Sequence, residues 1–294
     1  MVLTINKVSK NYKSIKALDE VSFAVPKGSV FGILGPNGSG KTTLLGIVMD
    51  VIKSNSGQFT WFENSKAGHH RKSIGTLLET PNFYHYLSAV QNLKVTAAIS
   101  GRNVNDIDRV LDVVGLTARK NSPFSSYSLG MKQRLAIAAA LMGDPEVLVL
   151  DEPTNGLDPN GIAEIRNLIT HLAQEGKTII MASHMLYEVE KVCTHVAILK
   201  YGKLLADGDV NEILMNEDIV QLAALDNKRL KEIMSSFTGC KNITMSDQFL
   251  QLAFSSGTAD LEKINRYCFE NGITLNHLVL KKKSLEAKFL ELTN

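Results

Sequence analysis

The sequence predicts an α/β protein in which a parallel β-sheet is covered by helices and followed by a small α+β domain. Two short apolar runs without alternation, Val30 to Leu34 and Val147 to Leu150, have the pattern of strands buried on both faces. Strand-like and helix-like segments follow one another along most of the chain, which is typical of a parallel sheet. After Gly208 the pattern changes, which indicates a second domain.

The elements before residue 217 follow in this order. Val2 to Val8 and Val21 to Val25 alternate like strands, and the segment from about 82 to 142 reads as a mostly helical subdomain inserted into the domain. Further helices are predicted at Thr42–Val51, Ile162–Leu172 and Met185–Val192, and further strands at Thr178–Ala182 and His195–Leu199. We therefore expect a first domain over residues 1–216.

The remaining residues, 217–294, are expected to form a small accessory domain. Its predicted strands are Ile219–Leu225, Phe249–Phe254 and Ile273–Leu280, and its predicted helices are Leu230–Phe237, Leu261–Asn271 and Ser284–Leu292. This segment offers no residue pattern with recognisable chemistry, so an accessory or dimer-supporting role is expected.

Composition excludes several classes of protein. The chain has 294 residues, 44% hydrophobic and 21% charged, which suits a globular protein with a sizeable core. Its net charge is only +2, so nucleic acid is not expected as a partner, and its three scattered cysteines are expected to be reduced thiols. No stretch reaches the ~20 apolar residues of a membrane span, and no signal peptide is predicted. We expect a cytoplasmic protein without direct membrane insertion.

A glycine-rich loop directly after the first buried strand carries the strongest chemical signal. It matches the pattern G-x-x-x-x-G-K-[ST] with Gly35, Pro36, Asn37, Gly38, Ser39, Gly40, Lys41 and Thr42, followed by Thr43. The glycines let backbone N–H groups point at one anion, and the following helix adds its positive end. Lys41 can reach the terminal phosphates of a nucleotide, and the Thr42 hydroxyl can bind Mg²⁺. The alternative is a glycine-rich turn that binds nothing.

Two carboxylates follow the second buried strand. A phosphate loop needs a second Mg²⁺ anchor from a nearby strand end, and Asp151 is the candidate. Glu152, one residue further along, would face the terminal phosphate, where a carboxylate can orient and polarise the attacking water. The alternative for Glu152 is a salt-bridged carboxylate at a strand end. With the glycine loop, the pair predicts hydrolysis of ATP with Mg²⁺.

Taken in order, these motifs resemble the ATP-binding-cassette family of transporter ATPases. The resemblance covers roughly residues 1–216 and rests on the phosphate loop, Ser128-Leu129-Gly130, Asp151-Glu152, Gly156-Leu157-Asp158-Pro159 and a lone His184 after a strand. It implies the P-loop NTPase fold, with a parallel-sheet core, antiparallel strands and an inserted helical subdomain. It also implies an ATP-hydrolysing subunit that drives a transporter.

The resemblance assigns more residues to the nucleotide. Tyr12 stands where the family has an aromatic ring that stacks on adenine, although a ring packed at a strand end is the alternative. Ser128 and Gly130 occupy the signature position, whose residues touch the terminal phosphate bound by a second subunit. Leu129 and Met131 depart from the usual Leu-Ser-Gly-Gly-Gln pattern, and a serine that only caps a helix is the alternative for Ser128. A homodimer closing over two ATP molecules is therefore expected.

Three further positions follow from the same resemblance. His184 resembles the switch histidine that contacts the γ-phosphate, and Asp158 the aspartate that communicates across the dimer. Glu79 stands where the family has a glutamine that links Mg²⁺ and water to the membrane subunit. A carboxylate could still offer Mg²⁺ an oxygen, but it adds negative charge beside the phosphates. Glu79 and the Ser-Leu-Gly-Met-Lys-Gln-Arg stretch are similar to the bacitracin-resistance and lantibiotic-immunity branch of exporters; drift within a general exporter ATPase is the alternative.

An aromatic cluster at residues 82–86 concerns the membrane partner. In the family this region forms the groove that receives a cytoplasmic helix of the permease, while packing in the protein's own core is an equal alternative. We expect a subunit on the inner face of the cell membrane that powers export of an antimicrobial peptide, an antibiotic or a similar amphiphile through a separate permease. A soluble cassette ATPase not coupled to transport and a nucleotide-sensing module without hydrolysis are the rival hypotheses.

Overall fold

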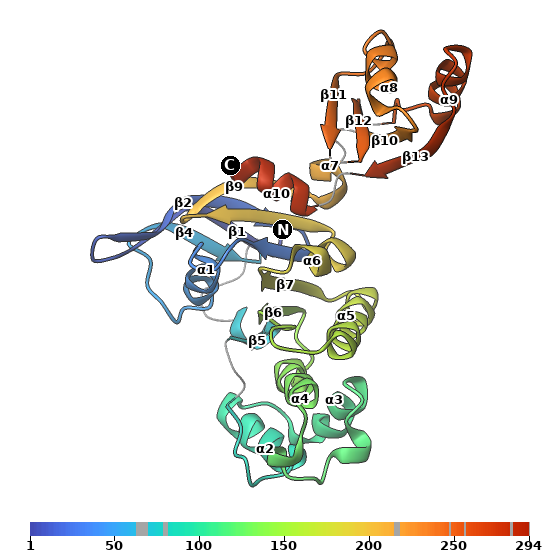
Figure 1. The fold of residues 1–294 in the computed structure, drawn as a ribbon. Coiled ribbons are helices and arrows are strands. Elements are labelled where there is room, and N and C mark those ends of the chain that lie inside the picture. Colours follow the sequence, from blue (N-terminus) through green and yellow to red (C-terminus); the bar gives the residue numbers. More distant parts are fainter. Residues whose placement is uncertain are drawn as a thin grey trace. The chain divides into compact units, whose positions relative to one another are not determined.

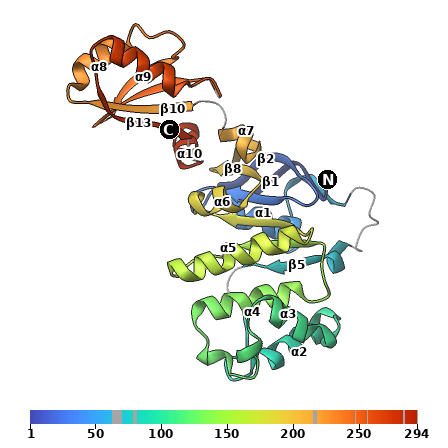
Figure 2. The ribbon, with the colours of Figure 1, turned by 90° about the vertical axis from the view of Figure 1, so that its right-hand side faces the viewer.

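The chain divides into two compact units, Met1–Gly208 and Asp209–Asn294. The computed structural model describes residues 1–62, 70–78, 82–214, 218–246, 248–255, 257–282 and 285–293 (Figures 1 and 2). The boundary predicted after residue 216 lies a short way beyond this division, past helix α7 (Val210–Leu214). Each unit is described by itself below.

The first unit is built on a six-stranded sheet in the order β5-β6-β7-β3-β8-β9 (Figure 1). These strands are β3 (Val30–Leu34), β5 (Ile74–Leu77), β6 (Val147–Asp151), β7 (Thr178–Ser183), β8 (His195–Lys200) and β9 (Lys203–Asp209). The neighbours from β5 to β8 pair in parallel. Every residue of β3, β6 and β7 is buried, and for β3 and β6 the unbroken apolar runs predicted this. Their carboxyl ends therefore meet at one edge of the sheet.

A smaller antiparallel sheet packs against this one in the order β2-β1-β4. Its strands are β1 (Leu3–Tyr12), β2 (Ile15–Val25) and β4 (Ser56–Trp61). The rings of Phe23 on β2 and Phe31 on β3 stack with centroids 5.2 Å apart, so the two sheets share one hydrophobic core. The antiparallel strands of the expected fold are confirmed.

Helices lie against both faces of the six-stranded sheet. Helix α1 (Lys41–Val48) contacts β6 and β7 as well as β2, so it touches both sheets. Helices α5 (Pro159–Gln174) and α6 (Leu186–Val192) contact β7 and β3 respectively, and Figure 1 shows them on the side away from α1. The parallel strands thus have helices on both faces, which explains why β3, β6 and β7 are buried along their whole length.

The predicted helical subdomain contains α2 (Ala89–Ser100), α3 (Ile107–Val113) and α4 (Leu129–Leu141). Helix α2 begins with a capping box formed by Ser88 and Gln91, and it ends at Gly101, which has a left-handed conformation. Helix α4 also contacts β5 and α5, so it links the subdomain to the sheet. Within the described part of the chain, every helix is too short or too polar to cross a membrane.

The second unit has a four-stranded antiparallel sheet in the order β11-β12-β10-β13. Its elements are α7, β10 (Asp218–Ala224), α8 (Asn227–Met234), β11 (Asn242–Ser246), β12 (Phe249–Phe254), α9 (Leu261–Glu270), β13 (Leu275–Lys282) and α10 (Leu285–Thr293). The order from β10 to β13 makes two interleaved β-α-β units. Leu230 of α8 and Ile264 of α9 pack with Leu222 in a separate hydrophobic core.

Candidate nucleotide site

The phosphate loop connects β3 to α1, and two of its glycines allow close packing. A Cβ on Gly35 would lie 2.3 Å from the carbonyl oxygen of Leu199 in β8. A Cβ on Gly40 would lie 2.5 Å from the carbonyl oxygen of Ala17 in β2, and Gly40 has a φ of 105°, which strains other residues. The loop is therefore seated tightly on strands of both sheets.

The other side of the loop is open toward the solvent. A Cβ on Gly38 would meet no described atom within 4 Å, and Gly40 precedes α1 without a side-chain cap. The first turn of α1, all of it described, also contains no acidic residue. The N–H groups at this helix start and the positive end of its dipole are thus left for an anion.

Lys41, Glu152 and His184 meet beside this loop. The Lys41 side chain is only 6% exposed, and its Nζ donates hydrogen bonds to the carbonyl oxygens of Gly35 at 2.8 Å and Pro36 at 3.3 Å. Glu152 places Oε1 3.5 Å from Lys41 Nζ and Oε2 2.9 Å from His184 Nδ1. Glu152 follows β6 and His184 follows β7, so neighbouring strand ends bring the two side chains together.

The backbone of Glu152 has an uncommon conformation. Its φ is 47°, in the left-handed region that residues other than glycine seldom adopt. Its N–H donates to the carbonyl oxygen of Ala182 in β7 at 3.0 Å, which ties the residue to the neighbouring strand. Backbone outliers of this kind persist where the surrounding structure fixes them, and they cluster at functional sites. The carboxylate is therefore held at a defined place beside the phosphate loop.

A cleft of about 450 Å³ opens over the loop, a size typical of small-ligand sites. It is lined by Tyr12, Ile15, Lys16, Ala17, Asn37, Gly38, Gly40, Lys41, Thr42, Thr43, Glu152 and Tyr201. Lys41 and the glycine loop make one region of it polar and cationic, whereas Tyr12 and Ile15 supply apolar surface. A ligand with phosphates joined to a flat aromatic base matches these two regions.

Sequence reasoning missed four of the residues that line this cleft: Ile15, Lys16, Ala17 and Tyr201. Tyr201 lies in the short turn between β8 and β9, and neither β9 nor that turn was predicted. The dipeptide Tyr201-Gly202 between two apolar runs is the signal that could have indicated a hairpin.

The residues expected to hold Mg²⁺ fit that ion in chemistry. Thr42 is exposed in the cleft, and Asp151 ends β6 with an exposed fraction of 5%. In the described ranges, no cluster of three or more His, Cys, Asp and Glu side chains could hold a metal by itself. A hydroxyl and a carboxylate, completed by phosphate oxygens and water, are the hard oxygen ligands that Mg²⁺ prefers. The third expected ligand, Glu79, lies outside the described residues.

The signature residues and Asp158 do not line this cleft. Ser128 begins α4, and its Oγ accepts a hydrogen bond from the Met131 N–H at 3.3 Å. Asp158 begins α5 in the same way, with Oδ1 accepting from the Gly161 N–H at 3.1 Å. Both side chains thus serve as helix caps within the chain. Contact of Ser128 and Gly130 with a nucleotide bound by a second subunit stays a prediction. Contact of Asp158 with the second subunit also stays a prediction.

The aromatic side chains at residues 82–86 differ in their contacts and in their exposure. Phe83 and His85 pack against Phe124, with ring centroids 5.3 and 5.6 Å away. Tyr84 and Tyr86 are instead 52% and 76% exposed. Phe83 is thus half-buried within the subdomain, whereas His85, Tyr84 and Tyr86 are exposed, and a contact of this segment with a partner stays a prediction.

A shallow groove of about 360 Å³ lies beside this cluster. Its lining residues are Asn82, Phe83, Tyr84, Asn92, Val95, Thr96 and Ile99. Asn92 is buried and fixes the preceding loop, because its Nδ2 donates to the carbonyl oxygens of Tyr84 and Leu87 at 3.1 and 3.2 Å. The loop that lines the groove is thus held in place by hydrogen bonds within the helical subdomain.

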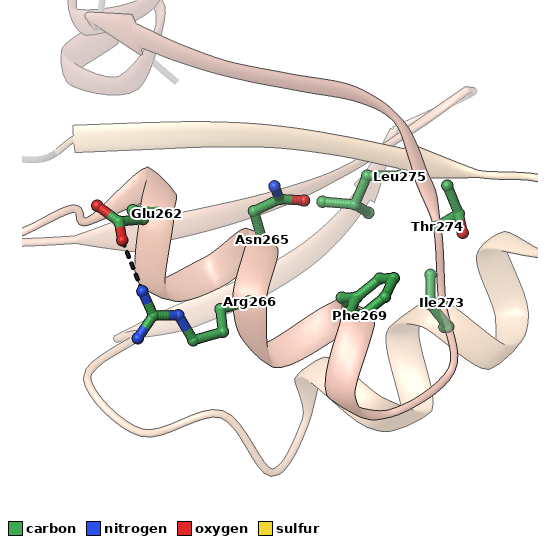
Figure 3. A pocket seen from close by; sticks show the side chains of 7 residues that line it. All are labelled: Glu262, Asn265, Arg266, Phe269, Ile273, Thr274 and Leu275. Atoms are coloured by element: carbon green, nitrogen blue, oxygen red, sulfur yellow. Dashed lines mark hydrogen bonds and ion pairs between the residues drawn. The ribbon is translucent and has the colours of Figure 1, made fainter.

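Another hollow lies in the second unit, between α9 and the start of β13 (Figure 3). Its charged residues, Glu262 and Arg266, form an ion pair of 2.6 Å along one face of α9. Phe269 beside them is 75% exposed. This arrangement satisfies its own charges, so it offers less chemistry than the cleft over the phosphate loop.

The fold and the cleft define a nucleotide-binding protein of the P-loop NTPase class. Comparisons with known proteins identify the family within that class. The family model described as ABC transporter matches residues 18–155. The chain is 34% identical to the bacitracin transport ATP-binding protein BcrA of Enterococcus faecalis, over 99% of this chain and 96% of that protein. It is 38% identical to the lantibiotic transport ATP-binding protein SrtF of Streptococcus pyogenes, over 74% of this chain and 98% of SrtF.

Solved structures agree with these relatives. A dimeric ATP-binding cassette in a post-hydrolysis state, bound to ADP and phosphate, matches with a TM-score of 0.62 and 25% identity over 71% of this chain and 98% of that one. The chain therefore belongs to the ATP-binding proteins of the ABC transporter family. It is an ATP-hydrolysing transporter subunit, and the predicted fold and enzyme class are confirmed.

Proposed function

We propose that this chain powers the export of an antimicrobial peptide or a similar amphiphile through a separate membrane permease. The observation that carries the proposal is the meeting of Lys41, Glu152 and His184 beside an open phosphate loop. The class of cargo is supported by BcrA and SrtF, which are named for bacitracin and lantibiotic transport.

Each group beside the loop has a role that its position supports. The loop N–H groups and Lys41 bind the β- and γ-phosphates, and for this Lys41 exchanges its contacts with the Gly35 and Pro36 carbonyls for phosphate oxygens. Glu152 orients a water for attack on the γ-phosphorus and accepts its proton, while His184 holds the carboxylate in place. Thr42 and Asp151 would hold Mg²⁺, which supplies neutralisation of phosphate charge when bound.

The proposed assembly is a homodimer that binds a permease. Ser128 and Gly130 lie at the start of α4 and outside the cleft of their own chain, which suits contact with a nucleotide bound by a second copy. The groove beside Tyr84 and Ile99 is the proposed seat of a permease helix, because exposed aromatic and aliphatic side chains are common anchors at interfaces. The permease would hold the chain on the inner face of the cell membrane.

The variant Glu152→Gln tests the proposed chemistry. The amide keeps the shape of the side chain but cannot accept the proton from water, so we expect ATP binding to persist while phosphate release falls by about 10²-fold or more. Phosphate release by the purified chain with Mg²⁺ and ATP is the measurement. Turnover at the wild-type rate in this variant would remove Glu152 from its role.

The same variant separates export from the rival hypotheses. We expect loss of the chain from its own cells to raise their sensitivity to peptide antibiotics, and we expect wild-type protein but not Glu152→Gln to restore resistance. Equal rescue by both proteins would favour a nucleotide-sensing module. An active ATPase whose loss leaves resistance unchanged would favour an enzyme not coupled to such transport.

A further inference from the structure

We propose that Tyr201 is a second aromatic contact for the nucleobase and that it shares the base with Tyr12. This inference rests on the proposed nucleotide site over the phosphate loop. Tyr201 and Tyr12 are the aromatic residues among those that line the cleft. Their side chains belong to different sheets, since Tyr12 ends β1 and Tyr201 follows β8.

Both rings are presented to solvent and are not packed in the core. Tyr201 is 77% exposed and Tyr12 is 45% exposed. Lys200 Nζ lies over the Tyr201 ring, 5.4 Å from its centroid, and Lys10 Nζ lies 5.1 Å from the centroid of Tyr12. An ammonium over one face of each ring leaves the opposite face for another planar group. Base–aromatic stacking is the contact that such faces favour.

The backbone conformation at Tyr201 is one that a tyrosine seldom adopts. Tyr201 and Gly202 form the whole connection between β8 and β9, and their φ values are 50° and 75°. Positive φ at both positions is what a type I′ hairpin turn requires, and Asn, Asp or Gly is preferred at the first position. A tyrosine there is strained, which points to a role for its side chain.

The same turn is fixed to the phosphate loop. The Gly202 N–H donates to the carbonyl oxygen of Ser39 at 3.1 Å, and the Gly202 carbonyl accepts from the Asp19 N–H at 2.8 Å. A Cβ on Gly202 would lie 2.7 Å from the carbonyl oxygen of Ala17, so the turn sits directly on β2. The distance from the Tyr201 backbone to the phosphate-binding N–H groups is therefore set by hydrogen bonds. A residue that binds the base needs such a fixed distance, because the phosphates of the same nucleotide are held at the loop.

The experiment compares ATP with inorganic tripolyphosphate, which has the phosphates but no base. We expect Tyr201→Ala to weaken ATP binding about fivefold or more and to leave tripolyphosphate binding within twofold of wild type. Tyr201→Phe keeps the ring and should bind ATP like wild type. Tyr187→Ala is the matched control, because Tyr187 is 63% exposed with Lys191 Nζ 3.8 Å from its ring centroid, yet it does not line the cleft.

The variant Tyr201→Asn distinguishes base contact from a structural role. Asparagine suits the turn, so we expect an unchanged or higher melting temperature together with the same loss of ATP affinity as Tyr201→Ala. Equal ATP binding by Tyr201→Ala and Tyr187→Ala would overturn the inference and leave the proposed function standing. A wild-type chain that bound neither ATP nor tripolyphosphate would instead overturn the proposed function.

Discussion

At the scale of single residues, the Glu152 carboxylate is shared between two partners of different chemistry. Lys41 Nζ lies 3.5 Å from Oε1 and can only donate hydrogen bonds as an ammonium group, whereas His184 Nδ1 lies 2.9 Å from Oε2 and can act as donor or acceptor. When Lys41 turns to a phosphate, the contact with His184 is the one that can still hold the carboxylate. This contact supports the proposal that His184 positions the Glu152 carboxylate.

We expect His184→Ala to lower the turnover number for ATP by about 10²-fold and to change ATP affinity much less, because the loss acts on the orientation of Glu152. Steady-state hydrolysis and equilibrium ATP binding are the two measurements. His171→Ala is the control, since His171 pairs with Glu175 at 3.4 Å on the surface of α5. Similar turnover in the two variants would contradict the role of His184.

Residue patterns predicted the phosphate loop, Asp151 and Glu152, because the chemistry of phosphates and Mg²⁺ demands those residue types after buried strands. Placing Tyr12 and His184 at the site needed the resemblance to a family, since an isolated tyrosine or histidine has no pattern of its own. The position of Tyr201 beside the cleft could not be predicted, because a hairpin signal does not show that the turn lies against the phosphate loop, where the Gly202 N–H donates to the Ser39 carbonyl.

At the scale of elements, strands with an unbroken apolar run or a regular alternation were predicted, and β4, β5, β9 and β11 were missed. β3 and β6 are fully buried and have unbroken apolar sequences. β4 is mostly exposed, β9 is nowhere fully buried, and β11 carries exposed Asn242 and Met245, so none of the three shows a clear hydrophobic period. The pattern of apolar residues therefore decided what could be predicted, and β5, with only four residues, is too short to show one even though it is mostly buried.

Asp106 connects α3 of the helical subdomain to the segment that follows α4. Its carboxylate accepts hydrogen bonds from Arg109 at the start of α3, at 2.5 and 2.9 Å, and from the Gly143 N–H after α4, at 2.7 Å. Burial alone would raise the pKa of Asp106, but these hydrogen bonds and the charge of Arg109 bring the pKa below its usual value of 3.8. The charged form therefore stabilises the folded protein.

We expect Asp106→Asn to lower the free energy of unfolding by about 1.5–3 kcal/mol near pH 7. Because the folded pKa is lowered, this stabilisation is present above pH 3.8 and is lost as the pH falls through the folded pKa, so the two proteins should converge in acid. Denaturant unfolding at several pH values measures this. Asp108→Asn is the control, since Asp108 is 78% exposed and its pair with Lys120 is a surface one. If the free energies of unfolding of Asp106→Asn and wild type differed by the same amount at all pH values, this role of the Asp106 carboxylate would be contradicted.

At the scale of the whole molecule, one chain holds only part of the proposed catalytic site. A Cβ on Gly130 would come no closer than 4.0 Å to its nearest neighbour, Gly161, so the chain itself has room for a side chain there. A larger residue at this position should leave the single chain intact and act only where another copy approaches.

We expect Glu152→Gln protein to form a dimer when ATP is added, because slow hydrolysis traps both nucleotides between the copies. Adding Gly130→Asp should keep it monomeric, since a carboxylate would then face the phosphates bound by the other copy. Light scattering after gel filtration gives the mass, and thermal unfolding checks that the fold is unchanged. An ATP-dependent dimer of the double variant would show that Gly130 does not lie against the nucleotide.

The separate hydrophobic cores of the two units have a consequence for how such proteins diversify. Val220, Leu222 and Leu252 belong to a core that includes no residue of the nucleotide-binding unit among those described. Substitutions that repack this core therefore change a set of side chains distinct from the core that supports the phosphate loop. SrtF is a shorter relative, since 98% of its length is matched by 74% of this chain.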